Sequence, residues 1–199
     1  MHVGPSGHAA LMTKPLLVLL FGLMITSCAD EGQLGADALW QIRCPRGTAG
    51  CTTPGEAANV IAYTGIMGAT VTCSVSELGN GDRLFNASIR ANTTQRLQIQ
   101  NLPITESGVV AGTSGIVVVE DEGNTFRANV GSSTPNETTA CQIASIAPVD
   151  REEGPSAYFQ LLCRGIFNPA NPDRTRRDLA YPNDSDRPAE ITIFNCPGF

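Results

Sequence analysis

Histidine and lysine are nearly missing from this chain. The two histidines and the single lysine, His2, His8 and Lys14, all lie close to the N-terminus. The rest of the chain therefore cannot form a Ser-His-Asp triad, a Cys-His pair, a histidine-ligated metal site or a histidine general base. The lack of lysine in the same region also excludes Schiff-base lysines and Ser-Lys dyads. We therefore expect no enzyme activity.

Positive charge is scarce as well. After residue 27 the chain has 12 Arg against 19 Asp and Glu, a net charge of −7. Nucleic-acid binding needs many cations on one face to neutralise phosphates, and a polybasic membrane contact needs a similar cluster. The composition argues against both. The chain also has no glycine-rich phosphate-binding motif, and we expect no cofactor.

One long apolar run lies near the N-terminus. Residues 15–25 are uncharged and almost wholly apolar. At about 1.5 Å rise per residue they are too short to cross a hydrocarbon core of roughly 30 Å. Lys14 precedes the run, and the small residues Thr26 and Ser27 follow it. Because this order is typical of a secretory signal, we predict that residues 1–27 are a signal peptide.

The segment before this run is long for the first part of a signal. Met12, followed closely by Lys14, would begin a more compact one. We therefore expect translation to start at Met12 rather than at Met1.

The signal ends at Ile25-Thr26-Ser27-Cys28, which resembles the lipobox of bacterial lipoproteins. In that motif an aliphatic residue lies three places before the cysteine, and small residues lie next to it. The resemblance implies that Cys28 receives a diacylglyceryl thioether, becomes the new N-terminus by cleavage, and can then be N-acylated with a chain such as palmitate. Two or three acyl chains give stable attachment where one is marginal, at about 0.8 kcal/mol per buried methylene. The alternative is an ordinary secretory signal in which Cys28 is one more cysteine.

The residue after Cys28 bears on the destination within the cell envelope. In Gram-negative sorting, Asp directly after the lipidated cysteine retains a lipoprotein at the inner membrane, and this chain has Ala29 there. The resemblance therefore implies the outer membrane. Residues 28–37 are small and polar, so we expect a lipidated N-terminus and a flexible tether before a domain at 38–199. The nine residues after Cys28 reach at most about 30 Å.

Six cysteines remain besides Cys28. An even set in an exported chain predicts three disulfides, and six cysteines allow 15 connectivities. Zinc is disfavoured because there is no C-x-x-C pair. The Pro- and Gly-rich loop between the first two cysteines favours a local disulfide, and we expect strand-to-strand disulfides for the other four. The predicted pairs are Cys44–Cys51, Cys141–Cys163 and Cys73–Cys196.

From residue 38 onward, short apolar runs alternate with turn signals, which is typical of successive antiparallel strands. Some runs have the period of two of a half-buried strand, such as Val71, Cys73 and Val75. We expect an all-β fold with a single disulfide-linked β-sandwich or jelly-roll-like domain of about nine short antiparallel strands, with an open barrel as the alternative. The candidate strands are 38–43, 58–63, 68–76, 83–90, 95–101, 115–121, 124–130, 139–147, 157–166 and 189–196.

Two turn signals predict hairpins. The sequence is Asn-Gly-Asp at 80–82 and Glu-Gly-Asn at 122–124. Gly and Asn tolerate the positive φ that tight turns require. The predicted hairpins are 68–76 with 83–90 and 115–121 with 124–130.

One long segment, residues 168–188, has no strand pattern and is rich in Asn, Pro, Asp and Arg. Loops longer than about 12–15 residues are usually functional or disordered. The simpler interpretation is a solvated loop whose charges compensate one another. The other is a binding loop, with Arg174, Arg176, Arg177 and Tyr181 as its candidate contacts.

Carboxylates are the remaining route to chemistry. A glycosidase needs two acids across a cleft. The densest acidic cluster is Glu120-Asp121-Glu122, at a predicted hairpin tip where acids are usually solvated. Asn183-Asp184-Ser185-Asp186 offers oxygens for calcium but lacks the EF-hand spacing, so we expect no metal site.

These observations favour a non-catalytic domain with an envelope structural or binding role. The alternative is a carbohydrate-binding or carboxylate-dependent glycan-active module. The expected partners are the lipid bilayer, through acylated Cys28, and another envelope protein or a glycan, with no nucleic acid.

Overall fold

The computed structural model places most of the chain after residue 31. It is all-β, with no helix in the placed residues, as the sequence predicts. No helix in this part is long and apolar enough to span a membrane. The predicted signal peptide and Cys28 lie outside the described residues. These are 32–45, 51, 54–79, 81–106, 108–132, 140–151, 154–170 and 176–199.

The described residues form twelve strands, so the expectation of about nine is too low. Most strands coincide with a predicted run, and the short strands β6 and β11 are additional. The strands are β1 (Gly35–Arg43), β2 (Ala58–Tyr63), β3 (Thr70–Glu77), β4 (Arg83–Arg90), β5 (Arg96–Thr105), β6 (Gly108–Val109), β7 (Gly115–Asp121), β8 (Asn124–Gly131), β9 (Cys141–Arg151), β10 (Gly154–Ile166), β11 (Arg177–Ala180) and β12 (Ala189–Phe194).

All the strands belong to one mixed sheet. Its order is β3–β4–β5–β7–β8–β9–β10–β12–β1, with β2 on the other edge of β1. β11 pairs with β1 and β10, the same two neighbours that β12 has, so it lies between them beyond the end of β12. The expectation of purely antiparallel pairing is wrong at one place, because β8 and β9 pair in parallel through Val130 and Gly131.

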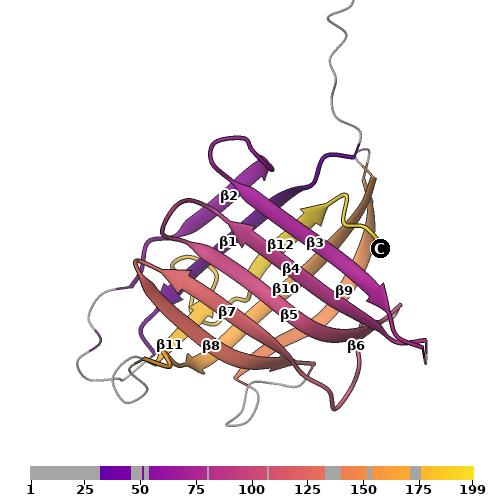
Figure 1. Ribbon diagram of the computed structural model, residues 1–199. Coiled ribbons are helices and arrows are strands. Elements are labelled where there is room, and N and C mark those ends of the chain that lie inside the picture. Colours follow the sequence, from indigo (N-terminus) through magenta and orange to yellow (C-terminus); the bar gives the residue numbers. More distant parts are fainter. Residues whose placement is uncertain are drawn as a thin grey trace, which may run out of the picture. The chain divides into compact units, whose positions relative to one another are not determined.

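The sheet folds over so that β3, β4, β5, β7 and β8 pass in front of β9, β10, β12 and β1 (Figure 1). The core lies between these two layers. Phe85 on β4 meets Phe159 on β10 edge to face, with ring centroids 5.7 Å apart. Both side chains are buried, as is Trp40 on β1. The predicted inward set on β3, Val71, Cys73 and Val75, packs on this core.

One irregularity on β5 keeps its apolar residues directed inward. Leu97 and Ile99 are buried, and so are Leu102 and Ile104, although the step from 99 to 102 breaks the period of two. Asn101 lies between them with φ of 51°, and the register with β4 shifts at the same level. An extra residue in one strand of this kind is a β-bulge, which restores the inward direction of the residues beyond it.

Both predicted hairpins are confirmed. β3 pairs with β4 along its whole length, and β7 pairs with β8 from Gly115 to Asp121. Glu122 and Gly123 form the two-residue turn of the second hairpin, with φ of 47° and 81°. Two positive φ values are the requirement of the tight turn that matches strand twist.

The three predicted disulfides are present, Cys44–Cys51, Cys73–Cys196 and Cys141–Cys163. Cys141 and Cys163 are directly opposed on β9 and β10. The Cys73–Cys196 bond joins β3 to the chain that follows β12, and the Val75 N–H donates to the Pro197 carbonyl at 3.1 Å. The front layer is thus covalently attached to the back layer at the edge where β3 lies.

The predicted boundary between tether and domain is wrong by several residues. β1 begins at Gly35 rather than 38, and Ala36 is fully buried. Gln33 is already fixed, since its side-chain amide donates to the Thr64 carbonyl and its own carbonyl accepts from the Asn195 amide, each at 2.8 Å. Small residues suit a tether, but here they suit close packing between β2 and β12. Residues 33–37, predicted as part of the tether at 28–37, therefore belong to the domain.

The segment 168–188 is likewise not one continuous loop. β11 lies within it, held between the ends of β1 and β10. A four-residue strand that pairs with two distant neighbours leaves little periodic signal in the sequence. Residues 171–175, and with them Arg174, lie outside the described residues.

The disulfides should differ in their contributions to stability. They link cysteines 123, 22 and 7 residues apart for Cys73–Cys196, Cys141–Cys163 and Cys44–Cys51. Because longer loops lose more unfolded-state entropy, replacing each pair by alanine should lower the free energy of unfolding by about 4.9, 3.4 and 2.5 kcal/mol, respectively. Urea unfolding monitored by fluorescence of the buried, single Trp40 would measure this order. A largest loss at Cys44–Cys51 would contradict it.

Candidate functional site

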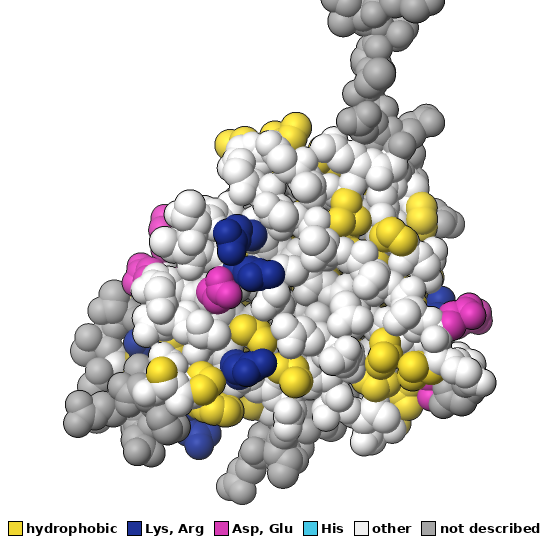
Figure 2. All heavy atoms as spheres, viewed as in Figure 1, with side chains coloured by type: hydrophobic (Ala, Val, Ile, Leu, Met, Phe, Trp, Pro, Cys, Tyr) yellow, Lys and Arg dark blue, Asp and Glu magenta, His cyan; other side chains and the backbone are white. Residues whose placement is uncertain are grey.

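The outer face of β3, β4 and β5 carries mainly neutral polar side chains. They line a shallow hollow of about 380 Å³. Figure 2 shows this face as largely neither charged nor hydrophobic. Hydroxyl and amide groups of this kind both donate and accept hydrogen bonds, as sugar hydroxyls do. Its polar lining side chains are Thr72, Ser74, Asn86, Ser88, Arg96, Gln98 and Gln100.

Arg96 is the one charged residue that lines this hollow. Its Nε donates to the Ser88 hydroxyl at 3.0 Å, and its Nη1 lies 3.7 Å from Glu120 Oε1. No acidic or aromatic side chain is among the lining residues. The hollow therefore has hydrogen-bonding groups for a neutral polar ligand, and it lacks the pair of carboxylates that glycoside hydrolysis uses.

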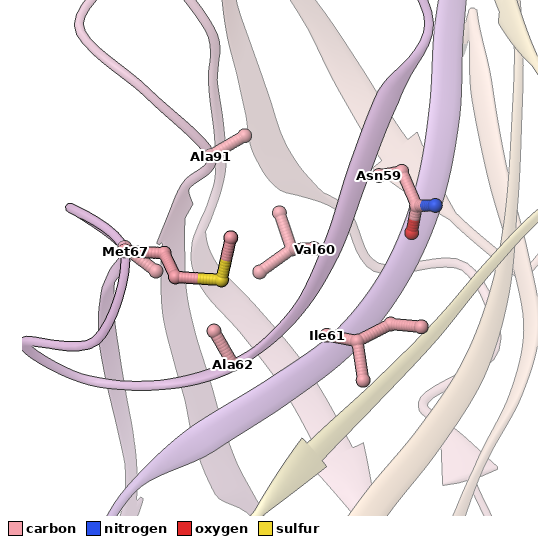
Figure 3. Close-up of a pocket in the computed structure, with 7 residues that line it drawn as sticks. Asn59, Val60, Ile61, Ala62, Met67 and Ala91 are labelled. Atoms are coloured by element: carbon pink, nitrogen blue, oxygen red, sulfur yellow. The ribbon is translucent and has the colours of Figure 1, made fainter.

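A second, apolar groove of about 270 Å³ lies beside β2. Figure 3 shows the Met67 side chain pointing toward Val60, with Ala62 and Ala91 around it. Asn59 is the only lining residue with a polar side chain. The groove offers apolar contact and little hydrogen bonding, so it does not resemble a catalytic site.

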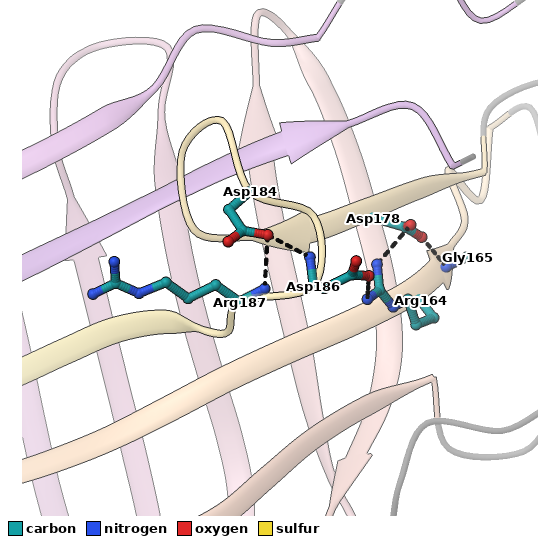
Figure 4. A network of polar contacts seen from close by, with 6 residues as sticks. All are labelled: Arg164, Gly165, Asp178, Asp184, Asp186 and Arg187. Atoms are coloured by element: carbon teal, nitrogen blue, oxygen red, sulfur yellow. Dashed lines mark hydrogen bonds and ion pairs between the residues drawn. The ribbon is translucent and has the colours of Figure 1, made fainter.

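Two acidic residues of the predicted binding loop are paired with Arg164 on β10, just before the loop (Figure 4). Arg164 contacts Asp178 through Nη1 and Asp186 through Nη2, each at 3.1 Å. Asp178 is buried and also accepts from the Gly165 N–H at 2.8 Å. The charges of these acids are therefore compensated as the simpler interpretation expects, but by an arginine outside the segment, and Asp178 is buried rather than solvated.

The charged side chains at residues 181–190 also contact their neighbours. The Arg187 guanidinium lies 3.6 Å from the centroid of the Tyr181 ring and 2.7 Å from Glu190 Oε1. Asp184 Oδ1 accepts from the backbone N–H of Asp186 and Arg187, so it closes a local turn. The described part of the chain contains no group of three or more His, Cys, Asp or Glu side chains arranged to hold a metal ion.

The predicted contacts of this segment lie against three different places. Arg176 is exposed, with Nη1 3.5 Å from the Gly165 carbonyl. Arg177 Nη1 donates to Cys44 Sγ at 3.1 Å, and Tyr181 is covered by Arg187. The described residues of the set therefore do not converge on one ligand position.

Asp121 is the feature that the sequence interpretation missed. Acids at its hairpin were expected to be solvated, but Asp121 is buried. Its Oδ1 lies 3.4 Å from Gln95 Nε2, which also donates to the Glu56 carbonyl at 2.8 Å. Gly55 packs so closely on the carboxylate that a Cβ at this position would overlap it.

Burial raises the pKa of Asp121, because desolvation disfavours its charged form. The hydrogen bond from Gln95 and the charge of Arg177 lower it in part, while Glu122 and Glu56 raise it. The segment around Gly55 that covers Asp121 is held by Gln41, whose Nε2 donates to the Gly55 carbonyl at 2.8 Å. No local pattern indicates this arrangement, since it joins four separate parts of the chain, at Gln41, Gly55, Gln95 and Asp121.

Asp121→Asn should remove a pH-dependent cost of folding. The folded state binds the Asp121 proton more tightly than the unfolded state, so the contribution of Asp121 to stability falls as pH rises through its pKa. The variant keeps an acceptor for Gln95. Its stability relative to the wild type should therefore increase from about pH 4 to pH 7, measured by urea unfolding at both pH values. Glu106→Gln, at an exposed turn, is the control that should not show this increase; a constant difference for Asp121→Asn would be evidence against the buried charge.

Comparison with known proteins gives no relative for this arrangement. The chain matches no family model, and no curated protein or solved structure matches it significantly.

Proposed function

We propose that this chain is a bacterial lipoprotein whose signal peptide, residues 1–27, is removed and whose Cys28 is acylated. Its domain is a non-catalytic β-sandwich with an envelope structural or binding role. The observation that carries the proposal is the pairing of the cysteines. Six of the seven form disulfides within the domain, and the seventh is the cysteine of the lipobox-like sequence.

The disulfides support export independently of the signal. Three disulfides form and persist in oxidising compartments outside the cytoplasm. A seventh cysteine in such a compartment would be an odd thiol, open to oxidation or intermolecular pairing. Acylation of Cys28 removes this thiol and supplies an anchor that the net negative charge of the domain cannot supply.

The outer membrane is the proposed destination, with Ala29 after the acylated cysteine and chains such as palmitate in the bilayer. The partners we propose are the bilayer itself and another envelope protein or a glycan. The acidic composition makes a nucleic acid an unsuitable partner.

The state of the acids supports a non-catalytic role. Glu120 lies near Arg96, Asp178 is held by Arg164, and Asp121 is buried beneath Gly55. A retaining or inverting glycosidase instead needs two carboxyl groups that flank an open cleft. Together with the lack of His and Lys after residue 14, this leaves the mature chain with few groups for acid–base or nucleophilic chemistry.

Carbohydrate binding is the second candidate function. The polar hollow on β3, β4 and β5 favours it, because Gln98, Gln100 and Ser74 present hydrogen-bonding groups without net charge. The lack of an aromatic platform among its lining residues means that affinity would depend on hydrogen bonds alone.

Acylation is tested by the mass of the mature protein. The membrane-extracted wild type should begin at Cys28 and carry the mass of two or three acyl chains, with three disulfides that reduction opens. Cys28→Ala should abolish cleavage by the lipoprotein signal peptidase and remove the acyl mass. Ala29→Asp is the matched variant: it should be cleaved and acylated normally but accumulate in the inner membrane. A wild-type N-terminus elsewhere than Cys28 would disprove the proposal.

Glycan binding is tested with soluble peptidoglycan fragments and the purified protein by isothermal titration calorimetry. Loss of one hydrogen bond in Gln98→Ala should weaken binding about two- to twelvefold. Thr125→Ala lies on β8, outside the hollow, and should bind as the wild type does. Equal weakening by both variants, or no heat of binding by the wild type, would count against this second function.

A further inference from the structure

The turn between β2 and β3 exposes two large apolar side chains. Met67 is 90% exposed and Ile66 is 50% exposed. We call these two residues the apolar tip. Figure 2 shows hydrophobic side chains at the upper end of the molecule, where Figure 1 places the β2–β3 turn. Single exposed apolar residues are common, but two adjacent ones at the end of a turn favour a contact with an apolar phase.

The backbone of the turn presents these side chains at a conformational cost. Gly65 and Gly68 have φ of 87° and 78°, and Met67 between them has φ of 52°. A non-glycine residue with positive φ is disfavoured, and Asn or Gly normally occupies such positions. Backbone strain of this kind is concentrated at functional positions. The turn therefore retains a methionine where a polar residue would fit the backbone better.

The surroundings of the tip are free of charge in the sequence. From residue 57 to residue 76, which covers β2, the turn and most of β3, there is no Asp, Glu, Lys or Arg. Ile61 on β2 is also exposed, but it pairs directly with the charged Asp37 on β1, so we do not include it in the tip. An uncharged apolar projection can enter the headgroup and upper acyl region without desolvating an ion.

The tip lies at the end of the domain from which the chain leads back to Cys28. Thr64 N–H donates to the Leu34 carbonyl, and the Gln33 amide donates to the Thr64 carbonyl, both at 2.8 Å. Gln33 is five residues after Cys28, which allows at most about 18 Å between them. Met67 is three residues after Thr64, or at most about 11 Å away. A membrane that holds acyl chains on Cys28 is thus kept within reach of the tip.

We propose that the apolar tip inserts into the interface of the membrane that anchors Cys28, so that acyl chains and tip together fix the orientation of the domain. This inference rests on the proposed lipidation. The acyl chains hold the protein on the bilayer, and Ile66 and Met67 add a second contact on the same end. Apolar residues of surface-bound segments enter about 5–10 Å into the headgroup and acyl boundary, a depth that a turn can reach.

Fluorescence quenching tests the insertion. The full-length Met67→Trp variant is expressed, purified in its acylated form and reconstituted into phosphatidylcholine vesicles whose acyl chains are brominated near the headgroup. Bromine quenches only indole groups that reach the lipid, and tryptophan is itself favoured at the interface. Emission from this variant should fall strongly in brominated vesicles compared with unbrominated ones. Wild type measures the background from Trp40, which is buried in the core.

Phe167→Trp is the matched control. Phe167 is also partly exposed but follows the far end of β10, ten residues beyond Ala157, or about 33 Å in the strand direction. Its emission should change no more than that of the wild type. A second readout leaves the domain unsubstituted, because Met67 is the only methionine after residue 27. Its oxidation by chloramine-T should be several-fold slower in vesicles than in a soluble form in which an ordinary cleavable secretory signal replaces residues 1–28.

The outcomes separate this inference from the proposed function. Acyl mass on Cys28, with quenching at Met67→Trp equal to that at Phe167→Trp, would overturn the inference and leave lipidation intact. Absence of acyl mass would overturn both. A concentration-dependent dimer that Met67→Asn abolishes, without quenching in vesicles, would assign the tip to a second copy of the chain and also overturn the inference.

Discussion

The attachment of the C-terminus to β3 is the constraint on which the rest of the domain depends. Every other junction of the sheet is a pair of hydrogen-bonded strands, but the edge at β3 is joined to the back layer by Cys73–Cys196 and by the bond from Val75 to Pro197. Gly198 allows this approach, since a Cβ there would lie 2.8 Å from the Val75 carbonyl oxygen. Phe199 then reaches Phe85, with ring centroids 5.6 Å apart, and covers the core at this edge.

The positions of most strands along the chain, the two hairpins and the disulfides could be predicted from signals in the sequence. Alternation on β3, β4 and β8 follows the pleat, and the turn at Glu122-Gly123 contains a residue that tolerates positive φ. Cys141 and Cys163 lie in two neighbouring strand-like runs, so an antiparallel pairing that opposes them is the simplest one. The more distant pair, Cys73 and Cys196, then remains once the local disulfide at Cys44 has been assigned.

The features that could not be predicted depend on contacts between distant residues. Gly35 and Ala36 are small, and small residues are typical of a tether. The same small size is what allows β1 to lie between β2 and β12. The position of Asp121 beside a tight turn predicts a solvated side chain. Gly55 and Gln95, from two other segments, cover it instead. In the predicted binding loop, Arg and Asp alternate in a way that suits either solvation or binding. Asp178 of this loop lies beside Arg164 on the adjacent strand β10, and only this tertiary position shows how its charge is neutralised.

The same contacts explain how a short anchor could hold the domain in a defined orientation. Gln33 is bound by both Thr64 and Asn195, and the rings of Tyr63 and Phe194 lie 6.0 Å apart beside it. The start of β1, the end of β2 and the end of β12 are therefore joined to Gln33 at one end of the domain. Arg164 lies seven residues along β10 from Ala157, which pairs with β12 near that end, so it is about 23 Å farther away. In the proposed lipoprotein, the anchored end would meet the lipid, while the charged end around Arg164 and Asp178 would face the aqueous space of the envelope.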